Sequence, residues 1–119
     1  MALKNYTGES GAGSAKTHTL DIPAGAVIAN FQSLTISVRG ADLSADVSIS
    51  IVDDGVTRWN AYLRNGTAAA TTKTVWEFHP GEIIIRGNTL TITTGAGGAG
   101  AVLVVSAVYN AYQNKLLGS

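Results

Sequence analysis

The stretch 75–109 constrains the fold of this chain most, because short segments rich in Val, Ile and Thr alternate in it with glycine-containing turns. β-Branched residues favour strands over helices. The turns contain Pro80-Gly81, Gly87-Asn88 and the run from Gly95 to Gly100. The stretch therefore predicts four short strands, and its longest apolar run, 102–109, is expected to be a central strand.

The segments before this stretch alternate apolar and polar residues with the period of two that half-buried strands show. These segments are 16–22, 33–39, 47–51 and 56–63. Asp53-Asp54-Gly55 predicts a tight hairpin turn, since Asp-Gly tolerates positive φ angles, and Asn65-Gly66 is a second signal of the same kind. About eight short strands without a helical pattern predict an all-β chain that folds as a single β-sandwich with jelly-roll-like topology.

Three parts are expected along the 119 residues. Residues 1–15 are rich in Gly, Ser and Ala, which predicts a flexible, extended N-terminal arm. Residues 16–109 are expected to form the β-sandwich domain, and a domain of this size can bury a core without disulfides or metals. Residues 110–119 are expected to be a C-terminal tail. A Gly-rich arm of this kind becomes ordered when a partner holds it. The presence of such an arm therefore favours a role in assembly.

Composition excludes several classes of function. Eight basic and eight acidic residues cancel, and charged residues make up 13% of the chain, about half the usual share. Balanced, sparse charge argues against nucleic acid as a partner, because phosphate contacts need clustered Lys and Arg. Without cysteine there are no disulfides or thiolate metal sites. The N-terminus lacks the apolar segment of a signal peptide, and no apolar run approaches about 20 residues, so we expect synthesis in a cytoplasm and no membrane partner.

Two motifs have the spacing of known sites but the wrong surroundings. The glycines from Gly95 to Gly100 match a dinucleotide-binding loop, yet a β-branched segment follows them where that loop requires a helix. Asp53-Asp54, with Asp42 and Asp46, offers oxygen ligands for Ca²⁺, but two carboxylates before a glycine are typical of a plain turn. We therefore predict neither a cofactor nor a metal site.

Paired carboxylates raise the possibility of glycoside hydrolysis, since Glu77 and Glu82 flank His79-Pro80-Gly81. No other residue with site-like character accompanies them. His18 is in phase with Leu20, so it is expected to be a partly buried strand residue and not a base. No Ser or Cys has the surroundings of a nucleophile. These observations predict no catalytic residues and a protein that is not an enzyme.

Three aromatic residues could form a platform for sugar rings. Trp59 and Trp76 are in phase with apolar neighbours, which predicts that both belong to the core. Tyr62 is expected to share the opposite face of its strand with Arg58 and Asn60. A carbohydrate-binding or host-attachment module of β-sandwich fold is therefore the alternative function.

One apolar segment does not alternate. Ile83, Ile84 and Ile85 follow one another, and such a row predicts a strand that is covered on both faces or lies at an interface.

Several segments together resemble small all-β structural proteins of tailed bacteriophages, such as capsid decoration (cement) proteins and head fibres. They are Trp76-Glu77-Phe78 with Pro80-Gly81, the stretch 86–92, and Gly95 to Gly100 followed by 102–105. The similarity covers the C-terminal third of the chain. It implies a β-sandwich or jelly roll, often a trimer, that sits on the capsid lattice or another virion surface and clasps its neighbours with an extended arm.

The expected function is therefore that of a non-enzymatic capsid decoration protein, located in the virion, that binds and stabilises the head lattice as a homo-oligomer. Its expected partners are copies of itself and the major capsid protein or another virion protein. Large apolar side chains lie in or beside the segments outside the predicted sandwich, and these are expected to carry the contacts between subunits. They are Leu3, Tyr6, Tyr109, Tyr112, Leu116 and Leu117.

Overall fold

The structure of the protein is a computed structural model that describes residues 3–67 and 76–112. Its strands are β1 (Lys4–Glu9), β2 (Lys16–Leu20), β3 (Ile28–Arg39), β4 (Val47–Asp53), β5 (Val56–Leu63), β6 (Trp76–Phe78), β7 (Gly81–Ile84), β8 (Leu90–Thr94) and β9 (Val102–Tyr112). Among the described residues there is no helix long and apolar enough to cross a lipid bilayer.

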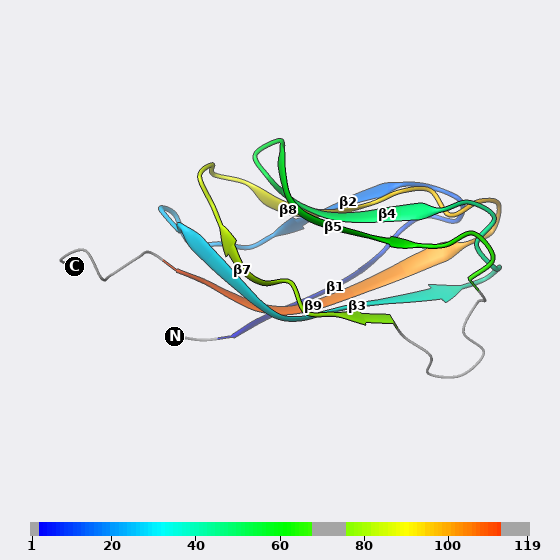
Figure 1. Ribbon diagram of the computed structural model, residues 1–119, viewed down its shortest axis with the longest axis horizontal. Coiled ribbons are helices and arrows are strands. Elements are labelled where there is room, and N and C mark those ends of the chain that lie inside the picture. The colour runs from blue at the N-terminus through cyan, green and yellow to red at the C-terminus, as the bar shows by residue number, and fades with distance from the viewer. Residues whose placement is uncertain (1–2, 68–75, 113–119) are drawn as a thin grey trace.

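The strands form two antiparallel sheets that pack face to face (Figure 1). Sheet A has the order β1-β9-β3-β6, with β7 also paired to β3, and sheet B has the order β2-β8-β4-β5. Consecutive strands lie in opposite sheets, with two exceptions: β4 and β5 form a hairpin in sheet B, and β6 and β7 both pair with β3 in sheet A. This is the strand order of a jelly roll. The predicted all-β sandwich with jelly-roll topology is confirmed.

The core lies between the sheets and is built from alternate residues of each strand. On β3, Leu34, Ile36 and Val38 are fully buried, as their phase predicts. On β9, Tyr109 stacks on Phe31 with ring centroids 5.5 Å apart. Burying a large apolar side chain stabilises the fold by about 1.5–3 kcal/mol, so these inward rows hold the two sheets together.

The N-terminal segment is extended, as predicted, but 4–9 do not project as an arm. They form β1, the edge strand of sheet A, with Lys4 opposite Tyr109 and Glu9 opposite Val104. Pairing with β1 satisfies backbone groups of β9 that would otherwise form an open sheet edge. An ion pair between Arg39 and Glu9, with Nη2 and Oε1 2.7 Å apart, spans β9 on the outer face.

The predicted C-terminal tail begins inside a strand. β9 continues to Tyr112, whereas the tail was expected to begin at residue 110. Tyr112 pairs with Ile28 at the start of β3, so this backbone pairing extends the strand. The rest of the predicted tail, 113–119, lies outside the described residues.

The turn predictions have different outcomes. Asp54 and Gly55 have φ angles of 46° and 89° and close the β4–β5 hairpin, as the type I′ turn requires. At Asn65-Gly66 the chain turns, but no hairpin forms, because β5 belongs to sheet B and β6 to sheet A. The predicted turn at His79-Pro80-Gly81 does not reverse the chain, since β6 and β7 both pair with β3 in the same direction.

The glycine-rich loop between β8 and β9 packs closely against the loop after β3. The amide of Ser44 donates to the carbonyl of Gly97 at 2.9 Å. A Cβ at Gly40, whose φ is 86°, would clash with the carbonyl oxygen of Gly100, and one at Gly97 would press on Leu43 at 2.7 Å. The glycine spacing that resembles a nucleotide-binding loop is therefore explained by close packing against the neighbouring loop and by the positive φ angles of Gly98 and Gly100.

We expect Gly40→Ala to destabilise the protein more than Gly55→Ala. Both glycines have positive φ, which costs a residue with a Cβ about 1 kcal/mol. Only at Gly40 would the Cβ meet backbone; the space around Gly55 is open. The clash should raise the total cost at Gly40 to about 3 kcal/mol. Equal losses of unfolding free energy in urea titrations of the two variants would contradict the packing role of the loop.

Candidate functional site

The structure does not bring together the two carboxylates that were considered for glycoside hydrolysis. Glu77 and Glu82 lie on the outer face of sheet A, opposite Thr35 and Asn30 of β3. Five residues along a strand correspond to about 16 Å, whereas the carboxylates of glycosidases lie roughly 5–9.5 Å apart. Glu77 instead pairs with His79, whose Nε2 is 2.9 Å from Oε2, on the exposed surface.

The aspartates considered for Ca²⁺ are also separated. Asp46 precedes β4 and Asp53 ends it, so they lie at opposite ends of the sandwich. Asp46 accepts a hydrogen bond from the amide of Asn65 at 2.7 Å. In 3–67 and 76–112, no three His, Cys, Asp or Glu residues form a group that could hold a metal ion.

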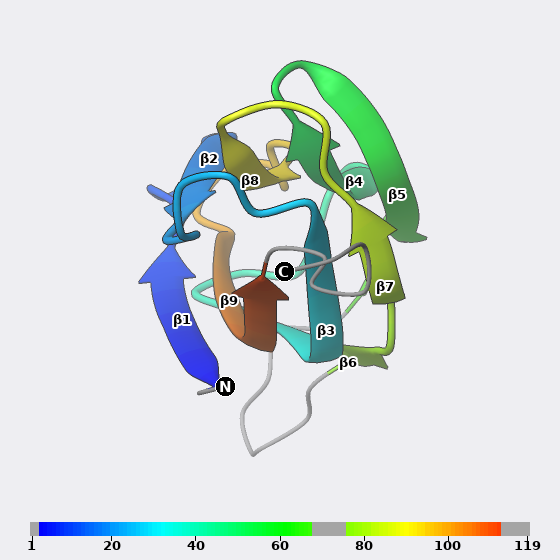
Figure 2. The same ribbon diagram turned by 90° about the vertical axis from the view of Figure 1, so that its left-hand side faces the viewer.

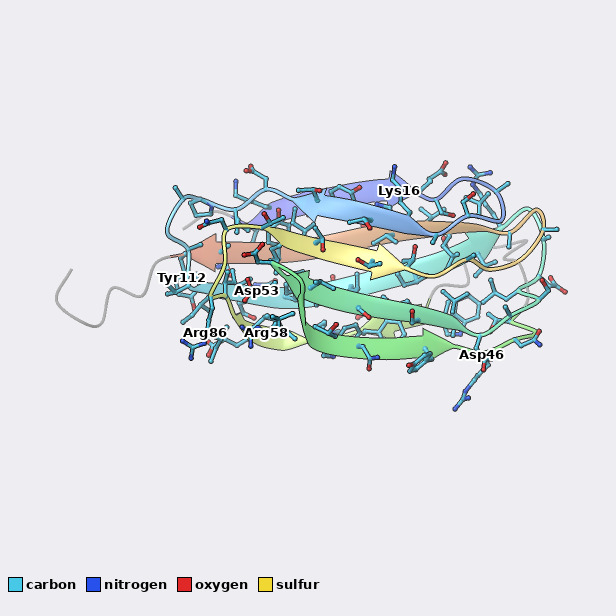
Figure 3. All side chains as sticks on the ribbon, turned by 90° about the horizontal axis from the view of Figure 1, so that it is seen from above. Lys16, Asp46, Asp53, Arg58, Arg86 and Tyr112 are labelled. Carbon is cyan, nitrogen blue, oxygen red and sulfur yellow. The ribbon has the colours of Figure 1, made fainter. Side chains whose placement is uncertain are left out.

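Asp53 is a buried carboxylate that ties three segments together at one end of the sandwich (Figure 3). Its side chain is 1% exposed and accepts hydrogen bonds from the amides of Arg86 at 2.7 Å and Gly87 at 2.9 Å. Arg58 donates from Nε and Nη2 at 3.1 and 3.0 Å. Burial alone would raise the pKa of Asp53, but these hydrogen bonds and the guanidinium charge outweigh it and hold the pKa below its ordinary value.

Arg58, Asn60 and Tyr62 were predicted to share one face of their strand, but Arg58 does not lie on that face. The register between β4 and β5 shifts between Ile51 and Val52, which leaves Arg58 as the extra residue of a β-bulge. A bulge changes the face to which a side chain points. Here it directs the guanidinium to Asp53 in place of the outer face.

Asp53→Asn is expected to lower the unfolding free energy by about 3 kcal/mol, because the buried donors lose a charged acceptor. Asp54→Asn, at the exposed neighbouring position, is the matched control and should change it by less than about 0.5 kcal/mol, since asparagine tolerates positive φ. Urea unfolding at pH 7 measures both. Two variants of equal stability would show that the Asp53 contacts contribute little.

Shallow depressions lie next to this cluster, between the β2–β3 and β7–β8 loops. Two adjoining hollows have volumes of about 330 and 370 Å³. They share Gly25, Ala26, Gly87 and Asn88 as lining residues, and the charged residue Arg86 lines the second. The residues that line these hollows include no acid–base pair and no nucleophile.

His18 and Tyr6 join the two sheets at the β1–β2 side of the sandwich. The Tyr6 hydroxyl lies 2.7 Å from His18 Nδ1, and His18 is 1% exposed, which confirms the predicted buried strand position. Nε2 of His18 has no hydrogen-bond partner. A Cβ at Gly8 would contact both side chains, so the glycine makes room for this contact. Burial and, to a lesser extent, the charge of Lys16 lower the pKa of His18.

Stability is expected to fall as the pH drops from 7.5 to 5.5. The pKa of His18 is below 6.5 in the folded state, so in this range the unfolded chain binds the proton more readily and gains stability relative to the fold. The slope cannot exceed about 1.4 kcal/mol per pH unit for one proton. Urea titrations should show the decline in the wild type and in His79→Gln, and its loss in His18→Gln. A decline that persists in His18→Gln would assign it to another group.

The predicted interface residues have different outcomes. Tyr109 is 1% exposed and donates its hydroxyl to the carbonyl of Asp21 at 2.7 Å, so the prediction that it contacts another subunit is wrong. Tyr6 is engaged with His18 inside the chain. Leu116 and Leu117 lie outside the described residues. Leu3 and Tyr112 remain available at the surface.

Leu3 and Tyr112 lie beside two isoleucines on the outer face of sheet A. Tyr112 is opposite Ile28, and Ile28 is opposite Ile84, so the three form a row across β9, β3 and β7. Leu3 continues the outward phase of β1 and is 49% exposed; Ile84 is 54% exposed. We call these four residues the apolar patch. Figure 2 looks onto its end of the sandwich, where β1 begins and β9 ends.

Leu3 and Tyr112 were expected in an interface from the sequence. Of the two isoleucines in the patch, the sequence pattern indicated one and missed the other. The unbroken row of isoleucines predicted a strand that is covered on both faces or lies at an interface, and Ile84 is exposed while Ile83 and Ile85 are buried. Ile28 carried no such signal, because its place depends on the pairing of three strands.

The aromatic residues lie as their phases predict. Trp59 and Trp76 pack against the core, and Trp59 meets Phe78 edge to face with centroids 5.6 Å apart. Tyr62 is 57% exposed on the outer face of sheet B. Of the aromatic platform considered from sequence, Tyr62 alone faces solvent.

Comparisons with known proteins give few matches. No protein-family model matches the sequence, and no curated protein matches it. Among solved structures, the chain is similar to a "Carbohydrate-Binding Module CBM36 in complex with calcium and xylotriose", with 10% sequence identity and a TM-score of 0.40 over 93% of this chain and 99% of that chain. Likeness at this level does not bear on function.

Proposed function

We propose that this chain is a non-enzymatic structural protein of a virion, of the capsid decoration type, that binds the head lattice of a tailed phage as an oligomer. The observation that carries the proposal is the apolar patch. Its residues lie on three adjacent strands and beside the start of a fourth, with Leu3 and Ile84 exposed and Ile28 and Tyr112 half-buried. Apolar side chains that cluster at the surface in this way mark protein–protein contacts.

The charge distribution supports a role in protein assembly. The chain has no net charge, so electrostatic repulsion between neighbouring copies on a lattice is small. The patch residues themselves are uncharged, and burying Ile84 and Leu3 would stabilise a contact by about 25 cal/mol per Å² of apolar area. Because so few side chains are buried, a single contact through the patch is weak.

Valency makes weak contacts sufficient on a lattice. Once one subunit of an oligomer is bound, the next contact forms at a high effective concentration. Identical subunits that contact each other head to tail close into rings when the rotation permits. The apolar patch is proposed to supply the contact between copies or with the capsid protein, and sheet B is left facing outward.

Ile84→Lys tests this role. Light scattering should show a discrete oligomer for the wild type, and sedimentation should recover it with capsids assembled from the major capsid protein of the same genome. A charge in the patch should weaken both by at least about tenfold, because an unpaired ammonium would be buried.

Tyr62→Lys is the matched control, since Tyr62 is 57% and Ile84 54% exposed and the two lie on opposite sheets. It should assemble as the wild type does. A wild-type chain that neither self-associates nor sediments with capsids would refute the proposal.

A further inference from the structure

The outer face of sheet B consists almost entirely of hydroxyl and amide side chains. Figure 3 views this face, with β2, β8, β4 and β5 side by side. We call its outward residues the hydroxyl face: Thr17, Thr19, Ser48, Ser50, Thr57, Asn60, Tyr62, Thr91 and Thr93, with Val52 among them. Such a concentration of one chemistry over four strands calls for an explanation beyond solubility.

The register places these side chains in straight rows across the sheet. One row runs Thr17, Thr93, Ser50 and Asn60, each directly opposite the next. The next row begins with Thr19 and Thr91. Neighbours in a row are about 4.8 Å apart and rows about 6.7 Å apart. The face is thus a regular lattice of groups that can both donate and accept hydrogen bonds.

Charge is absent from this lattice. None of the residues of the hydroxyl face is ionisable at neutral pH, whereas the outer face of sheet A carries Glu9, Arg39, Glu77 and Glu82. A charged partner would lose water there without gaining an opposite charge. A neutral partner rich in hydroxyl groups can exchange its hydrogen bonds with water for hydrogen bonds with the face.

Tyr62 adds an apolar surface at one corner. It lies opposite Ser48 on the edge strand β5, and more than half of its surface is exposed. An aromatic ring with a polar tip suits a ligand that has both an apolar and a hydrogen-bonding side. The ring of a neutral sugar has this character, with C–H groups on its faces and hydroxyls at its rim.

A second copy of the chain fits this face poorly. Two such faces are both held in place by their sheets, so many of their short hydroxyl side chains could not reach partners, and each group left without one would be costly. The hydroxyls of a sugar chain can turn to meet the face. From the regular hydroxyl lattice, its lack of charge and the exposed ring of Tyr62, we infer that the outer face of sheet B binds a neutral polysaccharide. This inference is independent of the assembly role, because the apolar patch lies on the opposite sheet.

Binding to a defined panel tests the inference. The probes are xylan, mixed-linkage β-glucan, cellulose and dextran, with polygalacturonate as a charged comparison, measured by pull-down and by affinity electrophoresis. The wild type should bind at least one neutral polymer and should not prefer polygalacturonate. Tyr62→Ala should weaken binding about tenfold, through loss of the stacking surface. Thr93→Val, which keeps the β-branched shape but removes a hydroxyl, should weaken it severalfold.

Controls on sheet A separate a specific effect from a general one. Thr7→Val removes an outward hydroxyl from β1 and should bind as the wild type does. Ile84→Lys alters the apolar patch and should keep the same preference among polymers, with an apparent affinity lowered only by the loss of valency. The inference is overturned if no neutral polymer binds, if polygalacturonate binds best, or if Thr7→Val reduces binding as much as Thr93→Val. It is also overturned if Tyr62→Ala changes the oligomeric mass, since the face would then be a subunit contact.

Discussion

The pairing of β3 with β9 is the constraint on which the rest of sheet A depends. It runs from Ile28 opposite Tyr112 to Arg39 opposite Val102. The other strands of the sheet attach to one of these two, β1 to β9 and β6 and β7 to β3. Because the partners lie far apart in sequence, the chain must close a long loop before any of this sheet can form. The apolar patch exists only once that pairing is complete.

Features that depend on neighbouring residues were readable from the sequence. The inward phase of Leu34 and Ile36, the Asp54-Gly55 turn and the core positions of Trp59 and Trp76 follow from a period of two and from turn chemistry, both of which are local. The exposure of Tyr62 follows from the same period. These signals sufficed for the fold class and for part of each proposed surface.

Features that depend on distant partners were not readable. Residues 4–9 look like a free arm until β9 offers them an edge. Arg58 has the phase of an outward residue until a bulge turns it toward Asp53. Tyr109 sits beside a polar tail in sequence, yet Phe31 and Asp21 enclose it. The rows of the hydroxyl face likewise depend on the register of four strands, which no single segment specifies.

The described part of the chain begins and ends at the same end of the sandwich. Lys4 lies opposite Tyr109 and Ile28 opposite Tyr112, so Leu3 and the end of β9 are near neighbours. This arrangement suits circular permutation, which succeeds where termini are close. Opening the chain at the exposed Arg64–Thr67 turn and linking the two ends would leave every strand pair intact. A cargo domain fused at the opened turn would emerge far from the apolar patch and leave the outer faces of both sheets free.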